Sequence, residues 1–480
     1  MDLFTAVNNY GYTENGALTY KSSLNKNLDL FSMGGASRNR AESDVISLVN
    51  NAYNEDPKTC IKILLFLRDI REGVGEKRIY RLAINELLKK NVNSRALLEA
   101  TIEVGSWKDV FLSFPFEVYA PFIKERYIEH KATGKYDLME KYMPSISGKY
   151  NKPAEMLAKY LGLTFKEYRK YLAEARKYLN IVETNLVNKS YENIDYSKLP
   201  SKAGLIYRNA FYRNDADRYR EFIASVSQGK AKMNTSTLAP YEILKRLIGE
   251  ITYGNGKVND DELLAIETTW QEFFKKTISS SRGIVVADVS GSMWGTPLNV
   301  AISLGMLFAE RNTGIFHNKL ITFSRNPNFI TYEDSDSLRM RIKKIVEANW
   351  DMNTNLQAVF DLILRTAKEN HLPEEELPNQ IYIVSDMEFD TCASHTNLEE
   401  IKRKYAESGY DFPNVIFWNV NSRQDNIPCK FNEKGVGLVS GASANIFNLV
   451  VEGELDPIKL MNNSINKERY ESMTNLICTV

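Results

Sequence analysis

The 480-residue chain has few of the residues that build disulfide frameworks and zinc sites. It contains four histidines and four cysteines, Cys60, Cys392, Cys429 and Cys478, and no two cysteines form a CxxC pair. This spacing excludes a disulfide-stapled secreted domain and the usual zinc motifs. We therefore expect a protein of a reducing compartment and a cytoplasmic location.

Long hydrophobic runs are also missing. No stretch approaches the roughly 18 uninterrupted apolar residues that a membrane span requires, and the first residues, MDLFTAVNNYGY, lack a basic region followed by an apolar one. We expect no membrane span and no secretion signal. The composition, 43 % apolar and 25 % charged, is that of folded domains. At roughly 100–200 residues per domain, the length predicts two or three of them.

The net charge of zero hides an uneven distribution along the chain. Residues 1–280 contain 42 Lys and Arg against 35 Asp and Glu, so residues 281–480 contain 19 against 26. The excess is steepest over residues 51–250, with 35 basic and 25 acidic side chains. Such an excess attracts a polyanion if the cations gather on one face, whereas it marks an ordinary solvated helical surface if they are spread out. Charge alone leaves both interpretations open.

Apolar residues recur at helical spacing from about residue 42 to residue 275. Asp56 followed by Pro57 indicates the start of one helix, and Asn93 is a candidate cap of another. Helical segments joined by tight turns are typical of stacked helical pairs. The pattern predicts an α-solenoid with HEAT-like repeats over about 40–275, although no strict sequence repeat is present.

After Ser281 the pattern changes to alternating strands and helices. We expect strands at residues 283–289, 320–323, 381–385 and 415–420, and helices at residues 298–310 and 356–368. Continuous apolar strands separated by amphipathic helices indicate a doubly wound parallel sheet in an α/β domain. Ligands of such domains lie beyond the C-terminal ends of the strands.

Oxygen donors stand at the ends of these elements. The first strand runs through Asp288 directly into Ser290 and Ser292, Thr354 precedes a helix, and Asp386 follows the strand at 381–385. Carboxylate and hydroxyl oxygens are suitable ligands for a hard cation such as Mg²⁺.

Sequence signatures of catalysis are absent. The chain has no acidic residue two positions after Asp288, no nucleophile elbow, and no HExxH or Walker sequence. We therefore expect no enzyme activity and no catalytic residues. A two-metal hydrolase that uses Glu388 and Asp390 beside Asp386 is the enzyme alternative.

The Asp-x-Ser-x-Ser sequence at Asp288, together with Thr354 and Asp386, resembles the metal-ion-dependent adhesion site (MIDAS) of a von Willebrand factor A domain. The surrounding DVSGSM and SDMEFD segments resemble the A domain that accompanies TROVE modules in the Ro autoantigen and its relatives. The resemblance implies a site for Mg²⁺, or for Mn²⁺ or Ca²⁺, held by five residues: Asp288, Ser290, Ser292, Thr354 and Asp386.

Segments of the N-terminal half resemble the TROVE-like helical module, particularly a TROVE-related branch of it. They are TENGALTYKSS near the start, LRDIREGVGEKR at 67–78, VGSWKDVF at 104–111, YRKYL at 168–172, and IDYSKLPSKA and RNAFYRND between 194 and 215. The resemblance implies a ring-like domain of HEAT-like helical repeats that binds RNA over residues 1–280. It also implies a von Willebrand A-like domain over 281–453 and a tail over 454–480 that packs on the helical domain.

Three groups of basic residues inside these segments are candidate RNA contacts, and each has a structural alternative. The alternatives are a helix-linking turn for the first group, a core tryptophan for the second, and tyrosines packed between helices for the third. The groups are Arg71, Lys77 and Arg78 around a glycine turn, Lys108 beside Trp107, and Arg208, Arg213 and Arg218 among tyrosines.

The family resemblance predicts an RNA-binding ribonucleoprotein component with a divalent-metal-dependent ligand-binding A domain. The implied partners are a small structured or single-stranded RNA and a protein carboxylate at the metal site. The alternative is a metal-dependent protein-binding scaffold, or assembly protein, that binds no RNA. Co-purification of RNA with the protein distinguishes the two.

Overall fold

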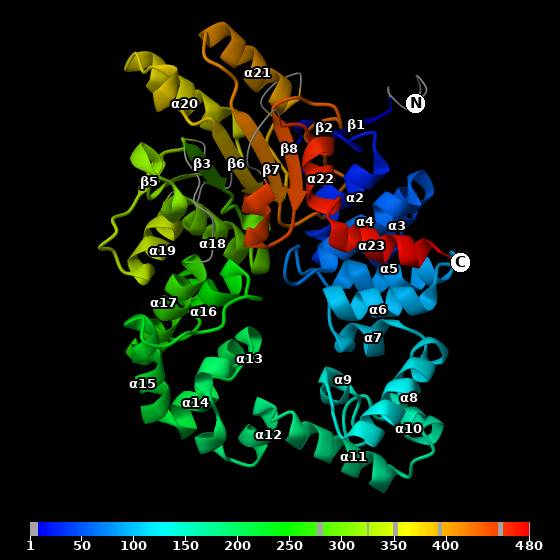
Figure 1. The fold of residues 1–480 in the computed structure, drawn as a ribbon. Helices are drawn as coiled ribbons and strands as arrows, with labels where there is room; N and C mark the ends of the chain where they lie inside the picture. The colour runs from blue at the N-terminus through cyan, green and yellow to red at the C-terminus, as the bar shows by residue number, and fades with distance from the viewer. Residues whose placement is uncertain are drawn as a thin grey trace. The chain divides into compact units, whose positions relative to one another are not determined.

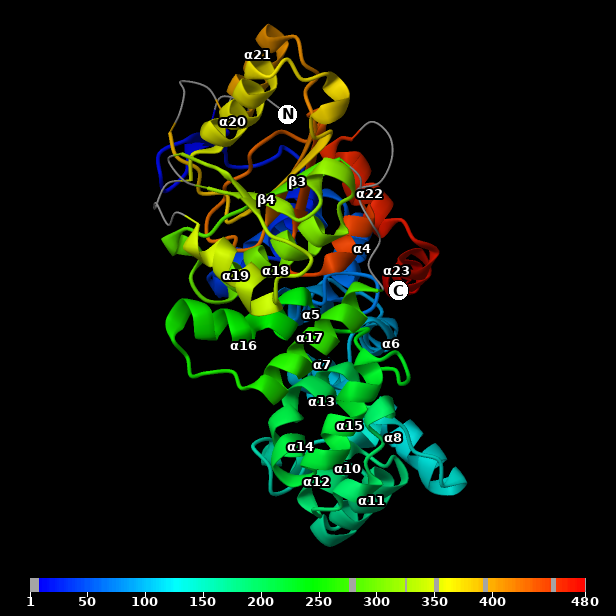
Figure 2. The same ribbon diagram turned by 90° about the vertical axis from the view of Figure 1, so that its left-hand side faces the viewer.

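The computed structural model describes residues 8–275, 282–323, 326–348, 354–391, 396–449 and 455–479. The backbone divides into two compact units. Unit 1 comprises Met1–Leu67, Glu72–Ile79 and Leu238–Lys467, and unit 2 comprises Arg68–Arg71, Tyr80–Thr237 and Glu468–Val480. The units are therefore interleaved along the chain and differ from the consecutive segments 1–280, 281–453 and 454–480 of the sequence prediction. Figures 1 and 2 show the labelled elements from two sides.

Unit 1 is built on a six-stranded sheet with the order β5-β4-β3-β6-β7-β8. The strands are β3 (Gly283–Ala287), β4 (Lys319–Thr322), β5 (Phe329–Thr331), β6 (Gln380–Ser385), β7 (Asn414–Asn419) and β8 (Val436–Ser440). The sheet is mixed and not wholly parallel as predicted, because β5 pairs antiparallel with β4. Only residues 323–328 separate these two strands, and a parallel crossover needs about a dozen residues or more.

Helices pack around this sheet. The helices of its α/β part are α18 (Thr296–Arg311), α19 (Leu338–Glu347), α20 (Leu356–Glu369), α21 (Asn397–Ser408) and α22 (Pro457–Ile465). Helix α18 packs on β3, β4 and β6, where Phe308 and Tyr382 have ring centroids 4.3 Å apart. The predicted strands and the predicted helices at 298–310 and 356–368 are confirmed to within two residues at each end. Strands β5 and β8 and helices α19 and α21 were not predicted.

The N-terminal segment belongs to the same unit as the sheet. Its elements, together with two later helices, are β1 (Tyr10–Tyr12), β2 (Leu18–Tyr20), α2 (Lys26–Gly34), α3 (Glu42–Glu55), α4 (Pro57–Arg68), α16 (Pro240–Tyr253) and α17 (Asp260–Phe274). Helix α2 packs against β8, and Ser440 Oγ donates to Phe31 O over 2.7 Å. A side chain at Gly35 would lie 2.5 Å from Ser440 O, so glycine permits this close approach.

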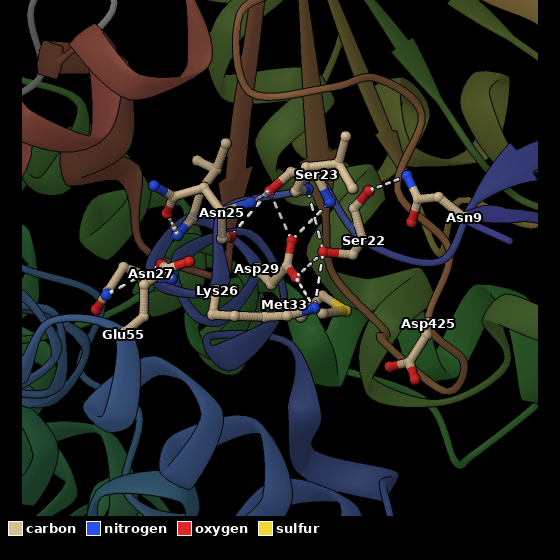
Figure 3. Close-up of polar contacts among 12 residues, drawn as sticks. Asn9, Ser22, Ser23, Asn25, Lys26, Asn27, Asp29, Met33, Glu55 and Asp425 are labelled. Atoms are coloured by element: carbon tan, nitrogen blue, oxygen red, sulfur yellow. Dashed lines mark hydrogen bonds and ion pairs between the residues drawn. The ribbon is translucent and has the colours of Figure 1, made fainter. Parts of the chain in front are cut away.

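Strands β1 and β2 pair antiparallel and form the N-terminal hairpin. A buried carboxylate, Asp29, fixes this hairpin to α2, as Figure 3 shows. Its oxygens accept hydrogen bonds from Ser22 Oγ at 2.5 Å and from Ser23 N and Oγ at 2.7 and 2.6 Å. Lys26 Nζ lies 3.5 Å from the same carboxylate. Asn9 Nδ2 donates to Ser22 O over 2.9 Å. The two serines of the TENGALTYKSS segment therefore anchor it, because a buried carboxylate must have such donors.

Unit 2 is helical. Its helices are α5 (Arg78–Leu88), α6 (Ser94–Val104), α7 (Trp107–Ser113), α8 (Phe116–Thr133), α9 (Leu138–Tyr142), α10 (Asn151–Tyr160), α11 (Phe165–Tyr178), α12 (Val182–Val187), α13 (Ser201–Ile206), α14 (Arg208–Asn214), α15 (Ala216–Ser227) and α23 (Glu468–Cys478). The predicted start of α4 at Pro57 and the predicted cap Asn93, whose Oδ1 accepts from Ala96 N over 3.0 Å, are confirmed. No described helix is long and apolar enough to cross a membrane.

The C-terminal tail divides between the units. Helix α22 packs on β8 of unit 1, and α23 packs on α6 of unit 2, where Asn93 N donates to Ile477 O over 2.9 Å. The predicted tail at 454–480 is therefore two structural pieces. The first piece also packs on α2, and the second packs on helices of unit 2, so both contact helices of the predicted segment 1–280.

Two of the segments that carry the family resemblance meet in the core of unit 2. Arg68, from LRDIREGVGEKR, donates to Asp109 Oδ2, from VGSWKDVF, through Nε at 3.2 Å and Nη2 at 2.6 Å. Arg81 Nε donates to Asp109 Oδ1 over 2.8 Å. Gly105 lets the pair form, because a side chain there would lie 2.8 Å from Asp109 Oδ2. This buried ion pair gives both segments a structural role.

Candidate functional site

The candidate metal centre begins at the C-terminal end of β3. Asp288 follows this strand and is held beside β6 by a backbone hydrogen bond to Val384 O at 2.9 Å. Its side chain is fully buried, and its two oxygens accept from Ser290 N at 2.9 Å and from Ser385 Oγ at 2.7 Å. Ser290 Oγ and Ser292 Oγ lie 3.1 Å apart on the turn that follows. The first strand and its turn therefore bring three of the five predicted ligands together.

Asp386 provides a second buried carboxylate directly after β6. Burial, together with the negative charge of Asp386, raises the pKa of Asp288 to about 6. Asp386 Oδ2 accepts a hydrogen bond from Arg423 Nη2 over 3.1 Å. Two neighbouring buried carboxylates repel each other, and a cation bound to both would cancel this repulsion.

Thr354 reaches the same region from the start of α20. Its side chain is buried, its carbonyl oxygen accepts from Asp390 N over 3.1 Å, and Asn15 Nδ2 lies 3.4 Å from its Oγ1. Thr354 is thus tied to the loop that follows Asp386. The residues just before it, 349–353, lie outside the described residues.

The donor set suits a hard divalent cation. Asp288 and Asp386 would supply carboxylate oxygens, and Ser290, Ser292 and Thr354 would supply hydroxyls, which are ligands that Mg²⁺, Mn²⁺ and Ca²⁺ accept. Each carboxylate oxygen of Asp288 accepts one hydrogen bond from the protein, so each has a further lone pair with which it can bind a cation. The assignment of these five residues to a metal stays a prediction.

The sequence prediction missed residues of the N-terminal hairpin and of the loop after β7 that surround this centre. Arg423 Nη2 lies 2.8 Å from Glu14 Oε2 and 3.1 Å from Asp386 Oδ2. Gln424 Nε2 donates to Glu14 Oε1 over 3.4 Å. The only signal in the sequence was the segment TENGALTYKSS itself. Nothing in this segment indicates that its contacts lie about 370 residues farther along the chain.

Glu388, which the enzyme alternative needed as a metal ligand, has both side-chain oxygens in contact with protein donors. Oε2 accepts from Glu14 N over 2.7 Å, and Oε1 accepts from Asn426 Nδ2 over 2.8 Å. Burial raises the pKa of this carboxyl group. These contacts describe an anchor for the N-terminal hairpin.

The glycine turn around Arg71, Lys77 and Arg78 already contains an anion. Glu76 Oε1 accepts from the backbone amides of Lys77 and Arg78 at 2.9 and 3.0 Å, and its Oε2 accepts from Arg38 Nε at 2.7 Å. The amides that could hold a phosphate at the start of α5 are thus turned to Glu76. Arg78 Nη1 donates to Ser37 O at 2.9 Å in unit 1, while Arg71 Nη1 donates to Glu103 O at 2.6 Å in unit 2.

The remaining candidate RNA residues are divided between core and surface. Trp107 is buried and stacks on Phe122 with centroids 5.8 Å apart, whereas Lys108 is exposed. Arg208 is buried, Arg213 is exposed, and Arg218 donates to the carbonyl oxygens of residues 191 and 194 at 2.8 and 2.9 Å. The three arginines therefore do not gather on one exposed face.

A different basic surface lies on α10 and α11. Lys166, Lys170 and Lys177 are all exposed, and their spacing of four and seven residues places them along one face of α11. Among the residues that the structure describes, none of these three lysines has an ion-pair partner. We call them the α11 lysine stripe. Further exposed cations on the two helices are Lys152, Lys159 and Arg169, with exposed aromatic rings at Tyr150, Tyr160, Phe165 and Tyr178.

Unit 2 also contains a cluster of buried His130, half-buried Asp137 and buried Glu140. His130 Nδ1 lies 2.6 Å from Glu140 Oε1, which also accepts from Tyr171 Oη at 2.6 Å. Arg126 forms an ion pair with Asp137. Each carboxylate of the cluster thus already has an ion-pair or hydrogen-bond partner within unit 2.

The chain is similar to known protein families and to individual proteins. The family model "Domain of unknown function (DUF2828)" matches residues 13–110 and 136–282, and the model "Domain of unknown function (DUF7788)" matches residues 282–475. A relative, "Uncharacterized protein L728" of Acanthamoeba polyphaga mimivirus, is 31 % identical over 509 residues, which cover 94 % of this chain and 86 % of that protein. The crystal structure of the Deinococcus radiodurans RO (RSR) protein aligns over 92 % of this chain and 99 % of that chain, with a TM-score of 0.41 and 11 % identity.

Proposed function

The chain belongs to the DUF2828 family, and we propose that this member is an RNA-binding protein whose sheet-containing unit binds a divalent cation. The observation that carries the RNA proposal is the separation of charge between the two units. Unit 2 contains 30 Lys and Arg against 21 Asp and Glu, whereas unit 1 contains 31 against 40. An RNA phosphate backbone is attracted to the first and repelled by the second.

The α11 lysine stripe is the best-placed part of this positive unit. Its lysines are exposed, whereas Arg208 and Arg218 of the sequence prediction serve buried or backbone contacts. The exposed rings beside the stripe offer surfaces on which unpaired bases stack. Cations interleaved with accessible aromatic rings favour single-stranded RNA or the loops of a structured RNA. Protein partners would use the metal centre instead.

The cation part of the proposal rests on the five donors around β3 and β6. Asp288 and Asp386 would hold the ion together with the hydroxyls of Ser290, Ser292 and Thr354. When bound, the ion would supply an electrophilic position for an external oxygen ligand. The chain's own residues keep the carboxylates buried and fix them through Ser385 and Arg423. We propose a binding role and no catalysis for this centre.

Substitution of the α11 lysine stripe tests the RNA proposal. We expect Lys166, Lys170 and Lys177, changed together to glutamine in the full-length protein, to flatten the slope of log K against log salt by about 2 units. The basis is a loss of roughly 0.7 per single-stranded phosphate contact. Binding of a fluorescent single-stranded RNA, measured by anisotropy from 50 to about 200 mM salt, gives this slope.

A matched control removes the same charge from unit 1. Lys257, Arg365 and Lys368 are exposed there, and their change to glutamine is expected to leave the slope unchanged. Equal slopes for the two triple variants would contradict an interface on α11. If the wild-type protein neither binds the RNA at low salt nor co-purifies with RNA, the RNA proposal is wrong and the scaffold alternative replaces it.

A further inference from the structure

The segment Thr13-Glu14-Asn15-Gly16, which we call the TENG loop, is attached to the loop after β6. Thr13 Oγ1 donates to Phe389 O over 2.6 Å, and Asn15 Nδ2 donates to Glu388 O over 2.7 Å. The backbone nitrogen of Glu14 donates to Glu388 Oε2 over 2.7 Å. None of these contacts uses the side chain of Glu14, so the loop holds its place independently of that carboxylate.

The TENG loop contacts one of the five candidate ligands directly and is linked to a second through Arg423. Asn15 Nδ2 lies 3.4 Å from Thr354 Oγ1. Arg423 Nη2 bridges Glu14 Oε2 at 2.8 Å and Asp386 Oδ2 at 3.1 Å, so the two carboxylate oxygens are less than about 6 Å apart. An ion with metal–oxygen distances of roughly 2.1 Å, or one that keeps a coordinated water, can be shared by oxygens this close after a small side-chain movement.

The backbone around Glu14 is constrained. Gly16 has φ +83°, and a side chain there would lie 2.7 Å from Thr391 Oγ1, so this position suits glycine alone. Farther along, Tyr20 and Ile427 exchange backbone hydrogen bonds at 3.1 and 2.9 Å. Arg40 forms an ion pair with Asp425 and thereby fixes the loop that carries Arg423. The fold therefore fixes the backbone positions of both Glu14 and Arg423.

We propose that Glu14 is a further carboxylate ligand of the divalent cation, bound directly or through a coordinated water and supplied by the TENG loop. This inference rests on the proposed cation site. Without the ion, the single positive charge of Arg423 is shared by Glu14 and Asp386, whereas a divalent ion brings two charges to the same carboxylates. With Glu14, the chain itself would supply the ion with a third carboxylate beside Asp288 and Asp386.

Binding of Mn²⁺ alone to the full-length protein tests the proposal. Electron paramagnetic resonance counts free Mn²⁺ in a titration and so gives the dissociation constant without any activity assay. We expect Glu14→Gln to weaken Mn²⁺ binding about tenfold or more, the range seen when groups around a metal are removed. Glu14→Asp, which keeps the carboxylate, should retain most of the affinity. Glu375→Gln removes an exposed carboxylate elsewhere in unit 1 and should have no effect.

Measurements in an Arg423→Gln protein distinguish direct binding of the ion by Glu14 from an effect that Glu14 exerts through Arg423. If Glu14 binds the ion, Glu14→Gln weakens Mn²⁺ binding in an Arg423→Gln protein as well. If Glu14 acts only as the partner of Arg423, the substitution has no effect in that background, and the proposal is overturned. Melting of the metal-free variants shows whether the fold is retained, which the backbone contacts of Thr13 and Asn15 lead us to expect.

A wrong cation site and a wrong role for Glu14 would give different Mn²⁺ binding results. If wild type and Asp288→Ala bind Mn²⁺ equally poorly, the cation site itself is wrong and the inference falls with it. If Asp288→Ala abolishes binding while Glu14→Gln matches Glu375→Gln, the site stands and Glu14 is not a ligand.

Discussion

Replacement of Asp109 by alanine is expected to destabilise unit 2 by about 3–5 kcal/mol, because it leaves a buried arginine without its counter-charge. Arg68 is 1 % exposed, and its Nε and Nη2 both donate to Asp109. Arg81 and Ser106 donate to the same carboxylate at 2.8 and 3.0 Å.

Urea unfolding followed by circular dichroism measures this loss. Asp217→Ala is the control, because Asp217 is fully exposed and solvent screens its ion pair with Arg220, which has a distance of 3.6 Å. An Asp109→Ala protein as stable as the control would contradict a structural role for the pair. It would then leave the LRDIREGVGEKR and VGSWKDVF segments without an explanation.

The same pair predicts an acid-dependent loss of stability. Burial by itself would raise the pKa of Asp109, but the guanidinium groups of Arg68 and Arg81 outweigh burial and lower that pKa below its ordinary value. The folded state therefore binds this proton less readily than the unfolded state. The resulting stabilisation is complete above the ordinary pKa of an aspartate and is lost as the pH falls through the lowered one. Asp109→Ala should remove this part of the acid dependence.

Divalent cations are expected to stabilise the wild-type protein by about 2.7 kcal/mol when present at a hundredfold excess over the dissociation constant. The gain arises because the ion binds the folded centre and relieves the repulsion of Asp288 and Asp386. Asp288→Ala should abolish it. Thermal melting in EDTA and in millimolar Mg²⁺ or Mn²⁺ measures the difference.

The control for this experiment is Asp411→Ala, which removes an exposed carboxylate of unit 1. It should keep the full stabilisation by the ion. Identical melting of the wild-type protein in EDTA and in metal, with no metal found by elemental analysis, would show that the five donors do not form a cation site.

The predicted bounds of the sheet strands show what local sequence can determine. The segments at 283–289, 381–385 and 415–420 were recognised because continuous apolar residues with helices between them have few other solutions. The edge strand β5 was missed, since its three residues, FIT, carry too little pattern to separate a strand from a loop. Its antiparallel direction follows from the short connection to β4.

Part of the candidate metal centre was predictable, because some of its residues come directly after strands with a clear apolar pattern. Asp288 and Asp386 each come directly after a recognised strand, and neighbouring parallel strands end at the same edge of a sheet. Glu14 and Arg423 were not predictable in the same way. Each lies in a loop, and a loop's neighbours depend on the packing of the whole chain.

The sequence by itself determined the strands β3, β4, β6 and β7, the helices α18 and α20, the start of α4 at Pro57, the cap Asn93, and the oxygen donors after β3 and β6. These are properties of neighbouring residues and of the repeat of the backbone. Only the tertiary structure decided that residues up to Leu67 belong to the unit that contains the sheet, that Arg68 pairs with Asp109, and that Arg423 links Glu14 of the TENG loop to Asp386. Contacts between residues far apart in the chain depend on which surfaces bury each other, and no local periodicity records that choice.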